Sequence, residues 1–168
     1  MRDARRYWMV RLGFGLIWGI DATLKWLPGF RDNYLAMIRT SAQGQPSWLL
    51  PFFHFWARTV QPAPSLFATL TALAETATCL CLLLGIAQRA GFIFGMIFGL
   101  LIWAVGEGFG GPYTSGATDI GSAIMYSVLF AALLVAVPRA IRAAAPSLDS
   151  RIVARWPALA PLTFDQAR

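Results

Sequence analysis

Two carboxylates stand near the two ends of a glycine-rich stretch, residues 106–119, that separates two apolar runs. Glu107 is the second residue of this stretch and Asp119 is its last. Five glycines and a proline lie within it. Those residues prevent either apolar run from continuing as a helix, so the backbone must turn here. Carboxyl groups at the border of an apolar bundle are costly to desolvate and are usually paired, protonated or functional. We therefore predict that Glu107 and Asp119 are the proton-handling, catalytic groups of a site at this loop.

Three further charged residues lie inside apolar runs, where each is a candidate for binding a ligand. Asp21 and Lys25 are four positions apart, so they share one face of a helix and can form an ion pair. Glu75 lies near the middle of another run, and acids in such positions are usually paired or functional. The alternative is purely structural: a self-neutralising Asp21–Lys25 pair, and a protonated Glu75 bonded to a neighbouring helix.

Aromatic residues near these charges could hold a flat ring. Trp103 and Phe109 flank the first turn of the glycine-rich stretch, and His54 lies within the aromatic run 48–56. The imidazole of His54 could donate to a quinone carbonyl or ligate a cofactor, and alternatively it is a hydrogen-bonding group of the membrane interface. The chain has one histidine and two cysteines, so no metal site is predicted.

The composition sets the surroundings in which these groups act. The chain has 168 residues, of which 57% are hydrophobic and only 13% are charged, whereas soluble domains carry roughly 25% charged residues. A chain this short cannot bury so much apolar surface within itself. We therefore predict an all-α integral membrane protein. The net charge of +6 comes from arginines at the flanks of apolar runs, which indicates membrane topology signals rather than nucleic-acid binding.

The apolar runs predict a four-helix transmembrane domain over residues 1–138, followed by a basic cytoplasmic tail over 139–168. Residues 30–63 are expected to be loop-like around a re-entrant or interfacial segment at 48–56, because that segment is too short to span. Residues 156–168 are expected to be weakly ordered. The predicted spans are about 8–27, 64–86, 90–106 and 119–137.

The third span carries a strip of small residues, with Gly91, Gly95 and Gly99 at every fourth position. Such a strip lets another helix approach closely, so we interpret these glycines as helix-packing residues. Arginines cluster at the N-terminus, at Arg89 and in the tail. By the positive-inside rule, both termini are then cytoplasmic and the loops that follow the first and third spans lie outside.

Three stretches resemble the DoxX and DoxD-like membrane proteins. They are residues 11–25, which contain Asp21 and Lys25; Glu75 followed by 82–85 and Arg89; and the loop motif 106–111 with 116–119. The resemblance covers residues 11–138 and implies a bacterial inner-membrane protein related to the large subunit of thiosulfate:quinone oxidoreductase. In that activity thiosulfate is oxidised and electrons pass to membrane quinone. Here Asp119 is followed by Ile120 and Gly121, where the family often has Pro-Gly.

Three functions remain open at this level. The chain is a quinone-interacting subunit of an oxidoreductase that needs a partner chain, or a non-catalytic accessory subunit of a larger membrane complex, or a small-solute transporter. In the accessory case, the glycine strip and the loop would bind helices of other subunits. The sequence contains no recognisable cofactor-binding motif, so quinone is the one cofactor predicted, together with lipid and other membrane subunits or a redox partner as binding partners.

Overall fold

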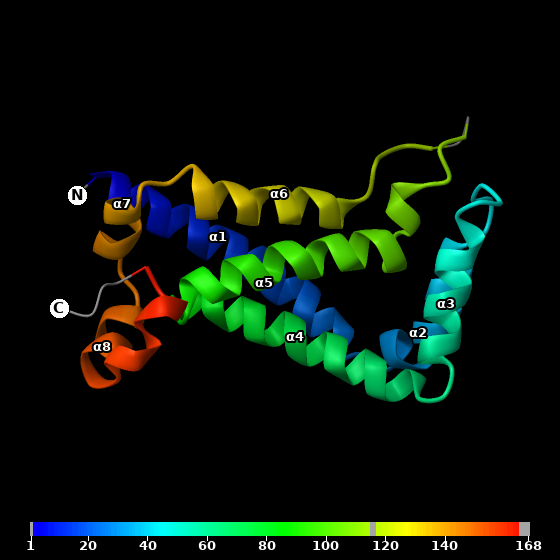
Figure 1. The fold of residues 1–168 in the computed structure, drawn as a ribbon, viewed down its shortest axis with the longest axis horizontal. Helices are drawn as coiled ribbons and strands as arrows, with labels where there is room; N and C mark the ends of the chain where they lie inside the picture. The colour runs from blue at the N-terminus through cyan, green and yellow to red at the C-terminus, as the bar shows by residue number, and fades with distance from the viewer. Residues whose placement is uncertain (1, 115–116, 165–168) are drawn as a thin grey trace.

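The computed structural model describes residues 2–114 and 117–164 (Figure 1). Gly116 of the loop motif and residues 165–168 of the predicted tail lie outside the described residues. Within the described part, every regular element is a helix, which confirms the all-α fold class.

In the described part of the chain, four helices run side by side and form the body of the molecule (Figure 1). Helix α1 packs mainly on α4, and α5 packs mainly on α6. Two of the four, α4 and the continuous α5–η1 helix, are long and apolar enough to cross a membrane. The bounds are α1 (Arg2–Lys25), α4 (Pro64–Leu84), α5 (Gln88–Leu101) with the π-helical turn η1 (Ile102–Gly106), and α6 (Ser122–Val135).

Aromatic side chains fill the centre of this bundle. Phe14 and Trp18 of α1 meet Phe130 of α6 at ring-centroid distances of 4.7 and 5.2 Å. Phe92 of α5 lies 6.1 Å from the same Phe130 ring. All four rings are buried. Edge-to-face contacts of this kind add about 0.5–1.5 kcal/mol per pair beyond burial, so this cluster holds all three helices together.

Two further helices, α2 and α3, cover one end of the bundle. Residues 30–41 were expected to be loop-like, and that prediction was wrong. Proline in the first turn favours a helix start, and Ile38 is buried while Arg31, Asp32 and Arg39 lie on the exposed face, so the segment is an amphipathic helix. The aromatic segment also forms a helix, too short to span a bilayer. The bounds are α2 (Pro28–Ser41) and α3 (Leu50–Val60).

The opposite end of the bundle, which we call the arginine-rich end, is covered by the C-terminal segment. Residues 156–164 were expected to be weakly ordered, and this too was wrong, because Phe164 packs 5.8 Å from Phe92 and stacks under the Arg142 guanidinium. The first and the last described residues lie at this end of the molecule (Figure 1). Its elements are α7 (Arg139–Ala144), α8 (Asp149–Arg155) and η3 (Pro157–Leu162).

Candidate functional site

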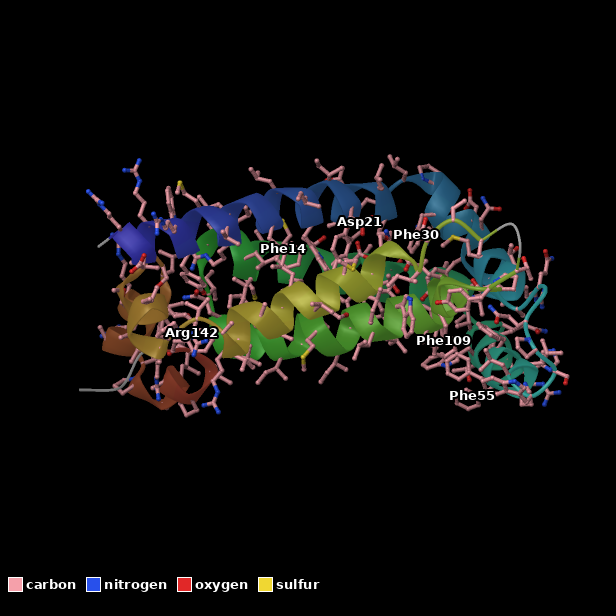
Figure 2. The ribbon with its side chains drawn as sticks, turned by 90° about the horizontal axis from the view of Figure 1, so that it is seen from above. Phe14, Asp21, Phe30, Phe55, Phe109 and Arg142 are labelled. Atoms are coloured by element: carbon pink, nitrogen blue, oxygen red, sulfur yellow. The ribbon has the colours of Figure 1, made fainter. Side chains whose placement is uncertain are left out.

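A cavity of about 250 Å³ lies where α2 and α3 close the end of the bundle. It is lined by residues of α1 to α6 and η1, and Figure 2 places Asp21 and Phe30 at this end, opposite Arg142. Its volume is just below the range of roughly 300–1,000 Å³ that is typical of pockets for drug-sized ligands. The cavity is therefore of a size for one small ring. Its charged lining residues are Asp21, Lys25, Glu75 and Glu107, and its aromatic ones are Phe30, Tyr34, Trp56, Phe67, Phe98 and Tyr126.

Asp21, Lys25 and Glu75 form a charged group on the bundle side of this cavity. Lys25 Nζ donates to Asp21 Oδ1 at 2.8 Å, as the spacing of four residues predicts. The same ammonium lies 3.7 Å from Glu75 Oε1, an ion-pair distance that is longer than a hydrogen bond. The end of α1 is also tied to α4 beside Glu75, because the Trp26 indole donates to Thr76 Oγ1 at 3.0 Å.

Glu75 is the most deeply buried member of the group, with none of its side chain exposed. Neither carboxyl oxygen has a hydrogen-bond partner among the described residues. Buried polar atoms in proteins are normally hydrogen-bonded, because an unsatisfied one costs about 1–3 kcal/mol and more if it is charged. Such an atom on a cavity wall is therefore an anchor point for a ligand that can donate a hydrogen bond.

Glu107 lines the cavity too, but its carboxylate is occupied by the start of α6. Oε1 accepts from Ser122 Oγ at 2.7 Å, and Oε2 accepts from the Ala123 backbone N–H at 3.1 Å. The first N–H groups of a helix have no partner within the helix and carry partial positive charge. Glu107 therefore caps the start of α6. To act as the predicted proton-handling group, it would have to give up these hydrogen bonds.

Asp119 is exposed and lies away from the cavity wall. Its Oδ1 accepts from the Gly121 N–H at 2.8 Å, which fixes the turn that precedes α6. This turn explains why α6 begins at Ser122, later than the start of the predicted span at 119. The two loop carboxylates thus hold the same helix start, but only Glu107 also faces the cavity.

Trp103 and Phe109 close the glycine-rich loop rather than the cavity. The Trp103 indole donates to the Ile120 carbonyl at 2.6 Å, and its ring lies 5.3 Å from that of Phe109. Phe109 in turn contacts Phe52 and Phe53 of α3. The predicted ring-binding pair is therefore used to join the loop to α3.

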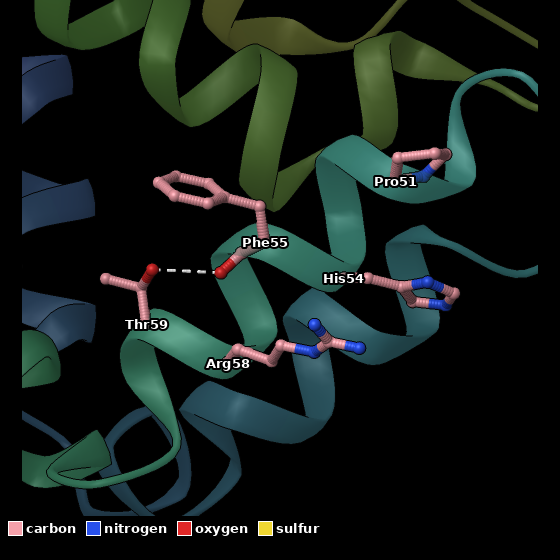
Figure 3. A pocket seen from close by; sticks show the side chains of 5 residues that line it. All are labelled: Pro51, His54, Phe55, Arg58 and Thr59. Carbon is pink, nitrogen blue, oxygen red and sulfur yellow. Dashed lines mark hydrogen bonds between the residues drawn. The ribbon is translucent and has the colours of Figure 1, made fainter.

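His54 lies on the outer face of α3, where it lines a separate open depression with Arg58 (Figure 3). Phe53, Trp56 and Val60 face inward on the same helix, and the 3.6-residue period places His54 on the opposite side. Pro51 lies in the first turn of α3, where proline favours a helix start. Once Pro51 is recognised as the first-turn proline of a helix, the inward and outward faces could have been assigned from the sequence.

The glycine strip of α5 is covered within the chain. Gly91 faces Cys81 of α4, with Cys81 Cβ 3.0 Å from the position that a Cβ atom on Gly91 would take. Gly95 faces the Phe130 ring and Gly99 faces Ser127 Oγ, both on α6. The strip is therefore occupied by α4 and α6 and is not open to a helix of another subunit.

Sequence reasoning missed two polar pairs of the cavity region and the network at the opposite end. In the cavity, the Tyr34 and Thr71 hydroxyls share a hydrogen bond of 3.0 Å. These polar residues were overlooked because hydroxyl side chains in apolar runs carry no distinctive spacing. Ser122, which donates to Glu107, sits at the first position of α6 and could have been recognised from the turn before it.

At the arginine-rich end, a buried network joins α1, α5 and the C-terminal segment. The Tyr7 hydroxyl donates to Gln88 Oε1 at 2.9 Å, and Arg11 donates to the same oxygen at 2.8 Å. Asp149 accepts from the backbone N–H groups of Ala87 and Gln88. Burial raises the pKa of Tyr7 to about 12, and the charge of nearby Arg11 opposes that shift. The tail is thereby fastened to the bundle end.

No family model, no curated protein and no solved structure matches this chain. The resemblance to the DoxX and DoxD-like proteins therefore stays a prediction.

Proposed function

We propose that this chain is an integral membrane protein in which α1, α4, α5–η1 and α6 cross the bilayer, and that its cavity binds the head group of a membrane quinone. The observation that carries the ligand assignment is the cavity itself, which combines aromatic walls with an ammonium and a carboxylate whose oxygens have no hydrogen-bond partner among the described residues. Aromatic rings stack on a flat ring, while the polar groups bond to its oxygens.

Exposed apolar surface supports the membrane assignment. Only 28% of the most apolar window is buried inside the protein in each of the two long apolar helices. A core helix of a soluble protein would be mostly buried. Large aliphatic side chains of α1 are also exposed, among them Leu16, Ile17 and Ile20. Lipid is the solvent in which such faces are stable.

The distribution of charge supports an orientation with both termini in the cytoplasm. Among the described residues, the arginine-rich end holds nine arginines against Asp3 and Asp149. The cavity end holds four basic residues against five acids. Positive charge accumulates on the cytoplasmic side of bacterial membrane proteins, so the cavity end would face outward. The nine arginines are Arg2, Arg5, Arg6, Arg11, Arg89, Arg139, Arg142, Arg151 and Arg155.

The oxidation of thiosulfate that the resemblance implies would fall to a partner chain. The binding step proposed here needs only this chain, and it can be measured without turnover. Trp56 lines the cavity, so a quinone bound there would quench its fluorescence.

The test is a titration of the protein in lipid nanodiscs with decylubiquinone. We expect saturable tryptophan quenching in which the part due to the site is lost in Trp56→Phe. Thr71→Phe fills the cavity and should weaken binding at least tenfold. The matched control is Thr59→Phe, which makes the same change on the exposed face of α3 and should bind like the natural protein.

Two results would overturn the proposal. One is quenching that rises linearly with quinone and is the same in Trp56→Phe, which would indicate partition into lipid alone. The other is equal affinity in Thr71→Phe and Thr59→Phe. A stable membrane partner that co-purifies with a protein unable to bind quinone would favour the accessory function instead.

A further inference from the structure

We infer that the cavity prefers the reduced, hydroxyl-bearing form of the ring over the oxidised, carbonyl-bearing form, with the Glu75 carboxylate as the acceptor of the ligand's hydroxyl group. This inference rests on the proposed function, because it concerns the same cavity. It follows from the hydrogen-bonding capacity that the protein itself leaves unused.

Glu75 is the deepest polar group on the cavity wall, and its ionised form offers only hydrogen-bond acceptors. Its side chain is fully buried, and both oxygens lack a hydrogen-bond partner among the described residues. A quinol hydroxyl can donate to such an oxygen, and a quinone carbonyl cannot, since its lone pairs would face those of the carboxylate. Hydrogen bonds to a charged group are stronger than those between neutral groups, so this single contact discriminates between the two forms.

Lys25 is the group that could favour a carbonyl instead, but its charge is shared between two carboxylates, Asp21 and Glu75. Its ammonium donates to Asp21 at 2.8 Å, lies 3.7 Å from Glu75 and sits 5.4 Å from the centre of the Phe30 ring. A carbonyl that took a hydrogen bond from Lys25 would compete with two carboxylates for it. The ammonium therefore stabilises the acids more than it attracts a ligand acceptor.

The hydroxyl groups of the wall do not reverse this preference. Tyr34 and Thr71 bond to each other, and Ser122 donates to Glu107. Tyr126 also lines the cavity, and a phenol hydroxyl can donate or accept, so it serves both ligand forms equally. The group that distinguishes the forms is thus Glu75.

Binding alone is proposed here, and no electron is transferred in it. The quinol keeps its proton on the ring oxygen and shares it with Glu75 through a hydrogen bond. A reaction that oxidises quinol elsewhere in the membrane, or one that supplies it, would exchange ligand with this site through the lipid.

The experiment compares the dissociation constants of decylubiquinol, kept reduced under anaerobic conditions, and decylubiquinone for the nanodisc protein. We expect the quinol to bind at least tenfold more tightly. In Glu75→Gln, the side-chain amide can donate as well as accept, so the two forms should bind with similar affinity. The matched control is Asp32→Asn, an exposed acid on α2, which should keep the preference of the natural protein.

The outcomes separate this inference from the proposed function. If neither form binds the natural protein, the proposed function fails. If both bind equally, or if Glu75→Gln keeps the full preference for quinol, the inference fails and quinone binding stands. If Glu75→Gln does not fold, the ratio of the two dissociation constants of the natural protein still tests the preference for quinol.

Discussion

The carboxylate of Glu107 accepts the backbone N–H of Ala123 at 3.1 Å, and this bond joins the end of the α5–η1 helix to the start of α6. Glu107, which the sequence predicts to be a catalytic group, thus caps the start of α6. The contact places Glu107 at the cavity and gives one of the unpaired N–H groups at the start of α6 an acceptor.

Removing this cap should destabilise the protein. Glu107→Ala leaves the Ala123 N–H and the Ser122 hydroxyl without their acceptor, at a cost of about 1–2 kcal/mol. Glu107→Gln keeps one acceptor oxygen and should lose less. Thermal unfolding in detergent measures both, with Asp32→Asn as the exposed-acid control. If both Glu107 variants unfold at the same temperature as the natural protein, the carboxylate is free for proton transfer, as the sequence suggested.

Gly121 should tolerate no side chain, because two separate features of its position exclude one. Its φ of 89° lies in a region that only glycine adopts easily, and a Cβ atom there would collide with Glu107 Oε2 and lie 3.1 Å from Trp103 Cδ1. Backbone strain of this kind costs about 1–3 kcal/mol. We expect Gly121→Ala to lower the midpoint of thermal unfolding.

The control for Gly121→Ala is Gly13→Ala in α1. Nothing lies within 4 Å of a Cβ atom at Gly13, and alanine favours a helix interior by about 0.5–1 kcal/mol over glycine. This change should raise the midpoint slightly or leave it unchanged. Equal effects of the two substitutions would show that the α6 turn is not under the constraint described.

Tyr7 should ionise later than an ordinary tyrosine as the pH rises. It lies before the first predicted span, and burial raises its pKa from 10.0 to about 12. A group whose pKa is higher in the folded state stabilises the fold fully below the unfolded value. That contribution is therefore present below pH 10 and declines between pH 10 and about 12.

Ultraviolet titration at the phenolate absorption band tests this difference. The spectrum of the natural protein minus that of Tyr7→Phe should contain a component that titrates near pH 12, and its midpoint should fall toward 10 in denaturant. A difference component with a midpoint near 10 in the folded protein would mean that Tyr7 is not buried in the network with Gln88 and Arg11.

Several features followed from the sequence because they depend on residues close together in the chain. The Asp21–Lys25 pair is an example, since four positions on a helix bring two side chains together whatever surrounds them. The all-α fold class is another, because it depends on composition and on apolar runs. The segments 30–41 and 156–164 were misjudged because their helices and contacts depend on packing against the bundle.

The amino-acid sequence by itself determined that this chain is helical, that its apolar faces exceed what it can bury, and that its charges gather at the ends of its apolar runs. Only the tertiary structure decided how the predicted site residues are divided. It brought Asp21, Lys25, Glu75 and Glu107 around one cavity. It left His54 on an outer face and turned Asp119 to the surface. The physical reason is that periodicity places a side chain on a helix face, whereas the neighbour of that face is set by how the helices pack.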